Sequence, residues 1–350
     1  MKTYEITIKP LSGFATPLKG DTIFGHFCWQ LAYDKQELPG EQLYTLIARY
    51  PEAPFVVFSS AFPKLYVNRS YTYALPSPNL PPDCMFDLPQ DTVQRIKKRK
   101  EVKSKKWMLV PEGKKFPSFK DLKFCNDKEL FDEFKAALSD TERQQIHKRG
   151  DGSCIADFLQ PHNTINRYTG TTGEGRFAPF SVEHGVYYPN TELALFVGMD
   201  EDVVTIEQVV MAIERIGDMG FGRDASSGLG RFCLGECMEI DLAGLGSDNP
   251  NACYTLAPCV PERGVYGDMF FTPFTRFGKH GDVLARSGNP FKCPVVMADE
   301  GAVFMPKNKD IPKKPYIGVG VTDISLAQDK TVAQGYSLYI PVNIPVSVEA

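Results

Sequence analysis

The sequence predicts an α+β protein built from two units that meet near residue 245. Strand-like and helix-like segments alternate over the first unit, and a strand pattern restarts at about residue 249. A chain of 350 residues is also long enough for two domains with a sizeable core. We therefore expect a first unit over 1–245, with an insertion at about 60–150, and a second unit over 246–350.

The N-terminal segment predicts a strand followed by a helix. Polar and apolar residues alternate over 4–9, and a loop rich in turn residues follows over 10–20. The segment at about 22–32 is largely apolar, so we expect a helix that packs on a sheet, with Asp21 as its N-cap residue. The prolines of 51–90 exclude a regular helix there and predict an ordered, extended segment.

The best-defined helix follows Thr205. Thr205 and Gln208 have the spacing of a capping box, and apolar residues then recur at helical spacing. We expect Gly217 and Gly220 to end this helix. A glycine-rich loop over 217–231 comes next, and 231–240 predicts a partly alternating strand.

Shorter patterns complete the prediction. An amphipathic helix is expected near 128–138 and a strand over 192–198. The second unit should contain strands near 253–257, 295–297, 302–305 and 336–342.

Charge and composition exclude several classes of protein. The net charge is −4, but 95–106 contains eight basic residues and one acid, a local charge of +7 that leaves −11 for the rest. A uniformly basic nucleic-acid coat is therefore excluded, and a polyanion would have to meet a local patch. No apolar run approaches the roughly 18 residues of a membrane span. The nine cysteines form no C-x-x-C pair, so we expect reduced thiols of a cytoplasmic protein, without disulfides, metal or cofactor.

The glycine-rich loop is the strongest functional signal. Because it follows a helix, it cannot place an anion on that helix's N-terminus as phosphate loops do. It instead offers glycine amides, the hydroxyls of Ser226 and Ser227, and the guanidiniums of Arg223 and Arg231. Such groups can pack against a phosphodiester backbone. The alternative is that the glycines only make a tight turn.

Segment 220–230 resembles the glycine-rich loop of the RAMP superfamily of CRISPR proteins. Other segments are similar to one branch of it, the fourth Csm subunit of type III-A effector complexes, a relative of the Cas5 group. These segments are 18–25, 162–172, the basic run that leads into Trp107, and, near the C-terminus, 300–304, 316–318 and 334–337. The similarity follows the order of the chain over nearly its whole length.

The resemblance implies two ferredoxin-like (RRM-like) domains and a non-catalytic subunit that holds the repeat-derived 5′ handle of the CRISPR RNA. It further implies contacts with the large polymerase- or cyclase-like subunit and with the backbone RAMP subunit of the filament. Target RNA near the handle is a further possible contact, and no membrane is involved.

In a ferredoxin-like fold, three loops would converge on one face: the first loop, segment 162–172 and the glycine-rich loop. We expect Lys19, Arg167, Arg176, Arg223 and Arg231 to contact phosphates, and the rings of Tyr168 and Phe221 to stack on bases. The predicted RNA-binding residues are Lys19, Asp21, Thr22, His26, His162, Asn163, Asn166, Arg167, Tyr168, Phe221, Gly222, Arg223, Ser226, Ser227, Gly228, Gly230 and Arg231.

Alternatives remain for several of these features. His26 could serve as the general acid or base of a metal-independent endoribonuclease that processes repeat RNA. A purely architectural subunit is a third possibility. Segment 162–172 could be only a polar hairpin with an asparagine turn. The basic run could be a solvated face, or a mobile element that RNA or an acidic partner orders.

Overall fold

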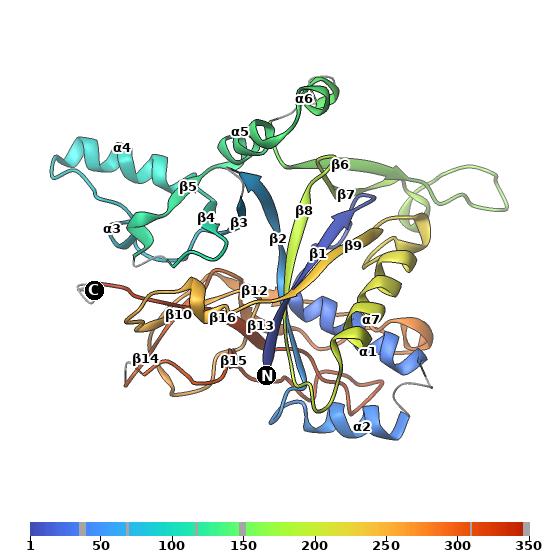
Figure 1. The fold of residues 1–350 in the computed structure, drawn as a ribbon. Helices are drawn as coiled ribbons and strands as arrows, with labels where there is room; N and C mark the ends of the chain where they lie inside the picture. The colour runs from blue at the N-terminus through green and yellow to red at the C-terminus, as the bar shows by residue number, and fades with distance from the viewer. Residues whose placement is uncertain (35–39, 68–69, 116–117, 147–151, 309, 346–350) are drawn as a thin grey trace.

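A computed structural model describes residues 1–34, 40–67, 70–115, 118–146, 152–308 and 310–345. Some residues of the predicted insertion and the last five of the predicted second unit lie outside this part. A seven-stranded sheet, antiparallel throughout, forms the centre of the fold (Figure 1). Its strands, in spatial order, are β5 (Lys123–Cys125), β4 (Trp107–Pro111), β3 (Ser70–Pro76), β2 (Val56–Val67), β8 (Glu192–Met199), β1 (Lys2–Pro10) and β9 (Phe232–Glu239).

Four of these strands and two helices follow one another as β1–α1–β2–β8–α7–β9, the β-α-β-β-α-β order of a split β-α-β unit. The pairing of Ile6 with Leu195 and of Ile8 with Leu193 aligns apolar residues that are completely buried. The alternation over 4–9 therefore predicted β1 correctly.

Helix α7 (Ile206–Met219) confirms the capping box, because Thr205 Oγ1 accepts from Gln208 N–H while Gln208 Oε1 accepts from Thr205 N–H. Gly220, with φ of 96°, ends the helix as predicted. The role predicted for Gly217 is wrong. It lies within the helix, where a Cβ would come 2.3 Å from Phe232 O, so its purpose is close packing of α7 on β9.

Helix α1 (Gly20–Tyr33) packs against β2 and α7, as its apolar composition predicted. The expected N-cap role of Asp21 is wrong. The N-cap residue is Lys19, which makes no side-chain cap hydrogen bond, and Asp21 lies inside the first turn. A Cβ on Gly20 would lie 2.3 Å from Phe58 O, so the helix begins where the chain can approach β2 most closely.

The predicted insertion extends the central sheet. Strands β3 to β5 continue it beyond β2, and a second core cluster that includes Leu65, Leu109 and Phe131 lies over this extension. The associated helices are α3 (Pro82–Met85), α4 (Thr92–Lys103), α5 (Asp127–Ala137) and α6 (Asp140–Ile146). Helix α5 confirms the amphipathic helix predicted there. As the prolines of 51–90 predicted, this segment contains no long helix among its described residues: it forms β2, β3 and the four-residue α3.

The basic run is a helix with counter-charges from this same chain, which favours the solvated face of the two alternatives. It forms α4, whose N-cap Asp91 accepts from Gln94 N–H, and the turn that follows. Its ion pairs are Arg95 and Arg99 with Asp83, Lys98 with Glu101, Lys105 with Glu129, and Lys106 with Asp127. The like charges are therefore partly neutralised without a ligand.

A second, five-stranded sheet follows residue 245. Its spatial order is β11 (Tyr266–Phe270), β14 (Val303–Pro306), β10 (Ala252–Thr255), β16 (Tyr336–Val342) and β15 (Tyr316–Gly318). β12 (Pro273–Arg276) and β13 (Val295–Ala298) pair separately. One hydrophobic core contains residues of both sheets, and the buried Gln334 side chain joins them by bonding Phe58 N–H and O.

A helix and a strand pair lie outside the two large sheets. Helix α2 (Gly40–Arg49) follows α1, and β6 (Ile155–His162) pairs with β7 (Phe180–Tyr187) as an arm that leaves the body of the molecule (Figure 1). The α+β class is confirmed. The two ferredoxin-like domains and their boundary at 245 stay predictions. Within the described residues, every helix is too short or too polar to cross a bilayer.

Candidate nucleic-acid interface

The glycine-rich loop leaves α7 and closes on itself before β9. Phe221 N–H donates to Gly230 O at 2.9 Å. A Cβ on Gly230 would lie 2.1 Å from Phe221 O, so only glycine allows the two segments to approach this closely. Gly220 is similarly confined, since its Cβ would lie 2.5 Å from Leu229 O. The loop is therefore narrow at its base, with 224–229 at its tip.

This loop docks on the first loop of the chain. Gly230 N–H donates to Gly13 O at 2.7 Å, and Arg223 N–H donates to Thr16 Oγ1 at 2.9 Å. Arg231 N–H donates to the Ser12 hydroxyl at 2.8 Å. The first loop also pairs with the arm, because Phe14 and Gly185 exchange backbone hydrogen bonds. Two of the three loops expected to converge, about 200 residues apart in sequence, are thus in contact. The third, segment 162–172, does not share these contacts as a whole.

The expected run of free glycine amides is not what the loop presents. The N–H groups of Gly220, Gly228 and Gly230 donate to protein carbonyls. Gly222 packs against Thr16, from which its Cβ would be only 2.5 Å away. A loop this closely packed spends most of its backbone donors on its own fold. Its ligand chemistry therefore rests on side chains.

Those side chains are at the tip and on the rim. Arg223 and Arg231 are exposed, as are Ser226 and Ser227. Gly228 has φ of 89°, and a Cβ at this position would have no other atom within 4 Å, so the tip is open to solvent. Guanidiniums and hydroxyls displayed on a narrow loop suit contact with phosphate oxygens.

The prediction that Phe221 stacks on a base is wrong for this structure. Phe221 is 0 % exposed and belongs to the main core. It lies against the half-buried His26 of α1, with 4.7 Å between ring centroids. Burial lowers the pKa of His26 to about 4, so its imidazole is neutral at physiological pH. Both rings help to hold the loop on α1.

Two further predicted residues, Lys19 and Asp21, form ion pairs with residues of the C-terminal part of the chain, after residue 245. Lys19 pairs with Asp299 and with Glu300, and the Lys19 Nζ to Glu300 Oε2 distance is 2.9 Å. Asp21 accepts a bidentate ion pair from Arg276, at 2.5 and 2.9 Å. A phosphate contact of Lys19 would therefore have to compete with two carboxylates of this chain, and it stays a prediction. Thr22, in the first turn of α1, is half-buried beside them.

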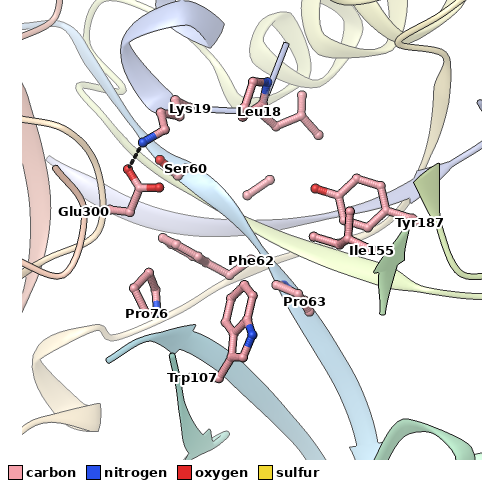
Figure 2. Close-up of a pocket in the computed structure, with 12 residues that line it drawn as sticks. Leu18, Lys19, Ser60, Phe62, Pro63, Pro76, Trp107, Ile155, Tyr187 and Glu300 are labelled. Atoms are coloured by element: carbon pink, nitrogen blue, oxygen red, sulfur yellow. Dashed lines mark hydrogen bonds and ion pairs between the residues drawn. The ribbon is translucent and has the colours of Figure 1, made fainter. Parts of the chain in front are cut away.

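Figure 2 shows Lys19 and Glu300 facing each other at the edge of a cavity of about 140 Å³. Trp107, Phe62 and Tyr187 line the same cavity from three different strands. Burial, reinforced by a hydrogen bond with Asp299, raises the pKa of Glu300 to about 7. Burial acts in the same direction on Asp299, but hydrogen bonds with Glu300 and Lys19 hold its pKa below its usual value.

The segment 163–168 lies at the outer end of the arm. The Asn166 side chain accepts from Tyr168 N–H at 2.9 Å, and Asn166 pairs with Thr171, so the asparagine turn is present. Asn163, Arg167 and Arg176 are exposed, and the ring of Tyr168 is 100 % exposed. An aromatic ring held out by an ordered turn is able to stack on an unpaired base.

His162 occupies a different position from its neighbours. It is the last residue of β6, and it meets His184 of β7 and Asp224 where the arm lies against the glycine-rich loop. The arrangement thus brings His162 and the glycine-rich loop together. It leaves 163–168 on the arm and directs Lys19 and Asp21 away from the loop.

No protein-family model and no curated protein sequence matches the chain. Solved structures do match it over its full length. One is a Csm3–Csm4 subcomplex of the type III-A CRISPR-Cas interference complex, with 14 % identity, TM-score 0.56, and 98 % of this chain and 100 % of that chain covered. The Csm1–Csm4 cassette in complex with pppApA gives 15 % identity, TM-score 0.53, and coverage of 99 % and 100 %. The Csm1–Csm4 cassette in complex with AMPPNP gives 15 % identity and a TM-score of 0.52, with 99 % of this chain and 99 % of that chain covered.

The chain has the fold of a Csm component. Csm4 is common to both kinds of complex, so the resemblance inferred from the sequence is confirmed at the level of the fold. At 14–15 % identity the likeness carries the backbone arrangement and no residue roles.

The sequence did not predict four residues of this region as site residues: Arg276, Asp299, His184 and Asp224. Arg276 and Asp299 come from β12 and the segment after β13, and only the tertiary fold brings them to α1. Their nearest sequence signal is the acidic pair 299–300, next to a segment that carries the family resemblance. For His184 and Asp224 the sequence holds no spacing that would have paired them with His162.

Proposed function

We propose that this chain is an RNA-binding subunit of a type III CRISPR effector complex. It holds the 5′ handle of the CRISPR RNA without cleaving it, and it joins a large cyclase-like subunit to the backbone RAMP subunit. The observation that carries the proposal is the full-length fold match to both Csm1–Csm4 and Csm3–Csm4 structures. A subunit common to both pairs stands where the large subunit and the filament meet.

The surface supports this role. Arg223, Arg231, Ser226 and Ser227 offer phosphate contacts on a loop that the first loop holds in place. Tyr168 and Arg167 offer stacking and charge on the arm. Recognition of unpaired RNA by stacking and backbone contacts needs this combination. The acidic remainder of the chain is left for protein partners.

The endoribonuclease alternative gains no support from the geometry. A general base works best when its pKa lies near the working pH, whereas His26 has a pKa of about 4 and packs on Phe221. A denaturing gel of repeat RNA incubated with the protein tests this point. Cleavage that disappears in His26→Ala would replace our proposal with the nuclease.

Binding of a fluorescent handle RNA, measured by anisotropy from about 50 to 200 mM salt, tests the interface. We expect Arg223→Ala to weaken binding and to lower the slope of log affinity against log salt by about 0.7, the value for one lost phosphate contact on a single strand. Lys2→Ala is the matched control, since Lys2 lies at the end of β1 opposite the first loop. Parent-like binding by both Arg223→Ala and Arg231→Ala would refute a ligand role for the loop.

Assembly provides a separate test. The chain should co-purify with a large cyclase-like subunit and with a backbone RAMP subunit when the three are co-expressed. Recovery of neither partner would contradict the linking role, whatever the RNA result.

A further inference from the structure

Three side chains from three segments converge where the arm lies against the glycine-rich loop. His162 ends β6, His184 lies in β7, and Asp224 begins the tip of the glycine-rich loop. One ligating atom of each lies within 4.8 Å of those of the other two. Among the described residues, no other group of three or more His, Cys, Asp or Glu side chains has its ligating atoms this close together.

The polar atoms of this cluster lack hydrogen-bond partners. His162 Nε2, His184 Nε2 and Asp224 Oδ2 are all buried, and none makes a hydrogen bond to a described residue. Asp224 Oδ2 forms an ion pair with Arg223 Nε at 3.5 Å, a distance too long for a good hydrogen bond. Folded proteins leave few buried polar atoms unpaired, because each one loses its hydration without compensation. Three such atoms in one place indicate a shared ligand.

The local structure fixes the three groups in position. His184 is 2 % exposed, so bulk solvent does not reach its unpaired nitrogen. The His162 ring stacks on Phe180, with 5.3 Å between centroids and 10° between ring planes. Asp224 has φ of 62°, and its carbonyl accepts from Ser227 N–H, so the turn holds the carboxylate toward the histidines.

Two imidazole nitrogens and one carboxylate oxygen form a donor set that suits a divalent transition metal. Zn²⁺ takes nitrogen and oxygen ligands at roughly 2.0–2.2 Å, so small side-chain movements would bring these atoms into range. Three protein ligands leave a fourth position for water or an outside ligand. A hard cation such as Mg²⁺ prefers oxygen ligands and is a poorer match.

We propose that His162, His184 and Asp224 bind one Zn²⁺-class ion, which ties the β6–β7 arm to the glycine-rich loop. The ion fixes the angle between the two elements that carry the exposed Tyr168 and Arg223. His162 is then a metal ligand and not an RNA contact. This inference does not depend on the proposed RNA role, because metal binding is measured without RNA.

Stoichiometry is the first test. The full-length protein is stripped with a chelator, exchanged against Zn²⁺ at low micromolar concentration, gel-filtered and analysed by mass spectrometry of the metal. We expect one Zn²⁺ per chain for the parent, and loss of that ion in His184→Ala and in Asp224→Asn. Glu183→Gln is the matched control, since Glu183 is an exposed carboxylate on the same strand. A parent without bound Zn²⁺, or equal loss in the control, would overturn the proposal.

Co²⁺ substitution is the second test, and it needs no variant that must fold. A tetrahedral Co²⁺ site of nitrogen and oxygen ligands gives visible absorption without the near-ultraviolet thiolate band. This distinguishes the cluster from adventitious binding at the exposed Cys233, Cys237 and Cys293. We expect the visible bands and a raised thermal midpoint with metal. A thiolate band, or no visible bands at all, would refute the assignment.

Discussion

Exposure divides the aromatic and charged residues of the candidate interface into two groups. Tyr168 stands fully in solvent, held by the Asn166 turn, whereas Phe221 is enclosed between α1 and the loop that carries it. Among the basic residues, Arg223 is exposed and makes a long, 3.5 Å ion pair with Asp224, whereas Lys19 is largely buried and faces two carboxylates. A side chain that already has a buried partner contributes little to an outside ligand, because binding would first have to break that pairing.

Tyr168→Ala should weaken handle binding by roughly 5- to 150-fold, the range expected for one lost base stack. The ring makes this contribution through its face, so Tyr168→Phe should bind like the parent. Anisotropy with the same RNA measures both. If Tyr168→Ala binds normally, the arm does not stack on the handle.

Glu300, which interacts with the neighbouring Asp299, gives a pH dependence that one substitution can test. Its pKa in the folded protein, about 7, lies above the usual 4.5, so the native state holds a proton that the unfolded chain has lost between these values. The stability from this group is complete below about pH 4.5 and is lost as the pH rises through about 7. Urea unfolding should therefore show that the unfolding free energy of Glu300→Gln, relative to that of the parent, is higher at pH 8 than at pH 5. An equal difference at both pH values would contradict this sign. Glu183→Gln is the exposed control.

Within the glycine-rich loop, each glycine has its own structural role. Gly230 permits the close approach of two backbone segments, Gly222 makes room for Thr16, and Gly228 turns the chain at an open tip. The loop is therefore rigid at its base and accessible at its end. An element of this kind can present side chains to a ligand at low entropic cost.

A pair of alanine substitutions separates these roles. Gly230→Ala meets Phe221 O at 2.1 Å and has an unfavourable φ of 71°, so it should cost about 2–5 kcal/mol of unfolding free energy, from strain and overpacking together. Gly228→Ala has only the unfavourable φ of 89° and should cost about 1–2 kcal/mol. Urea denaturation measures both. Equal costs would mean that the loop base relaxes freely.

At the scale of the whole molecule, the two sheets share one core and buried polar links. Gln334 bonds the backbone of β2, and Arg276 holds Asp21 at the start of α1. These links join the first helix to the C-terminal part of the chain. The face that carries the first loop is thus positioned by residues more than 250 positions away.

Arg276→Ala should destabilise the protein by about 3–5 kcal/mol, because it leaves the Asp21 carboxylate buried without its partner. The control is Lys115→Ala. It breaks the ion pair with Asp248, which also joins the two parts of the chain but is exposed on both sides, so little change is expected. Thermal and urea unfolding report both variants. A small effect of Arg276→Ala would show that water reaches Asp21 readily.

The sequence by itself determined the strongly periodic elements: β1 by alternation, α7 by its capping box and apolar face, α5 by its amphipathic pattern, and the glycine-rich loop by composition. These signals are local, because hydrogen bonding and side-chain direction repeat every two or 3.6 residues. The order of motifs also predicted the Csm-like fold.

Only the tertiary structure decided which predicted residues are available. In the folded chain Phe221 is buried, and Lys19 is paired with Asp299 and Glu300. Asp21 forms an ion pair with Arg276, and the basic run has acidic partners. The tertiary structure also brings His162, His184 and Asp224 together. The reason is physical. Burial and ion pairing depend on which distant segments pack together in the core, and local sequence patterns do not specify those contacts.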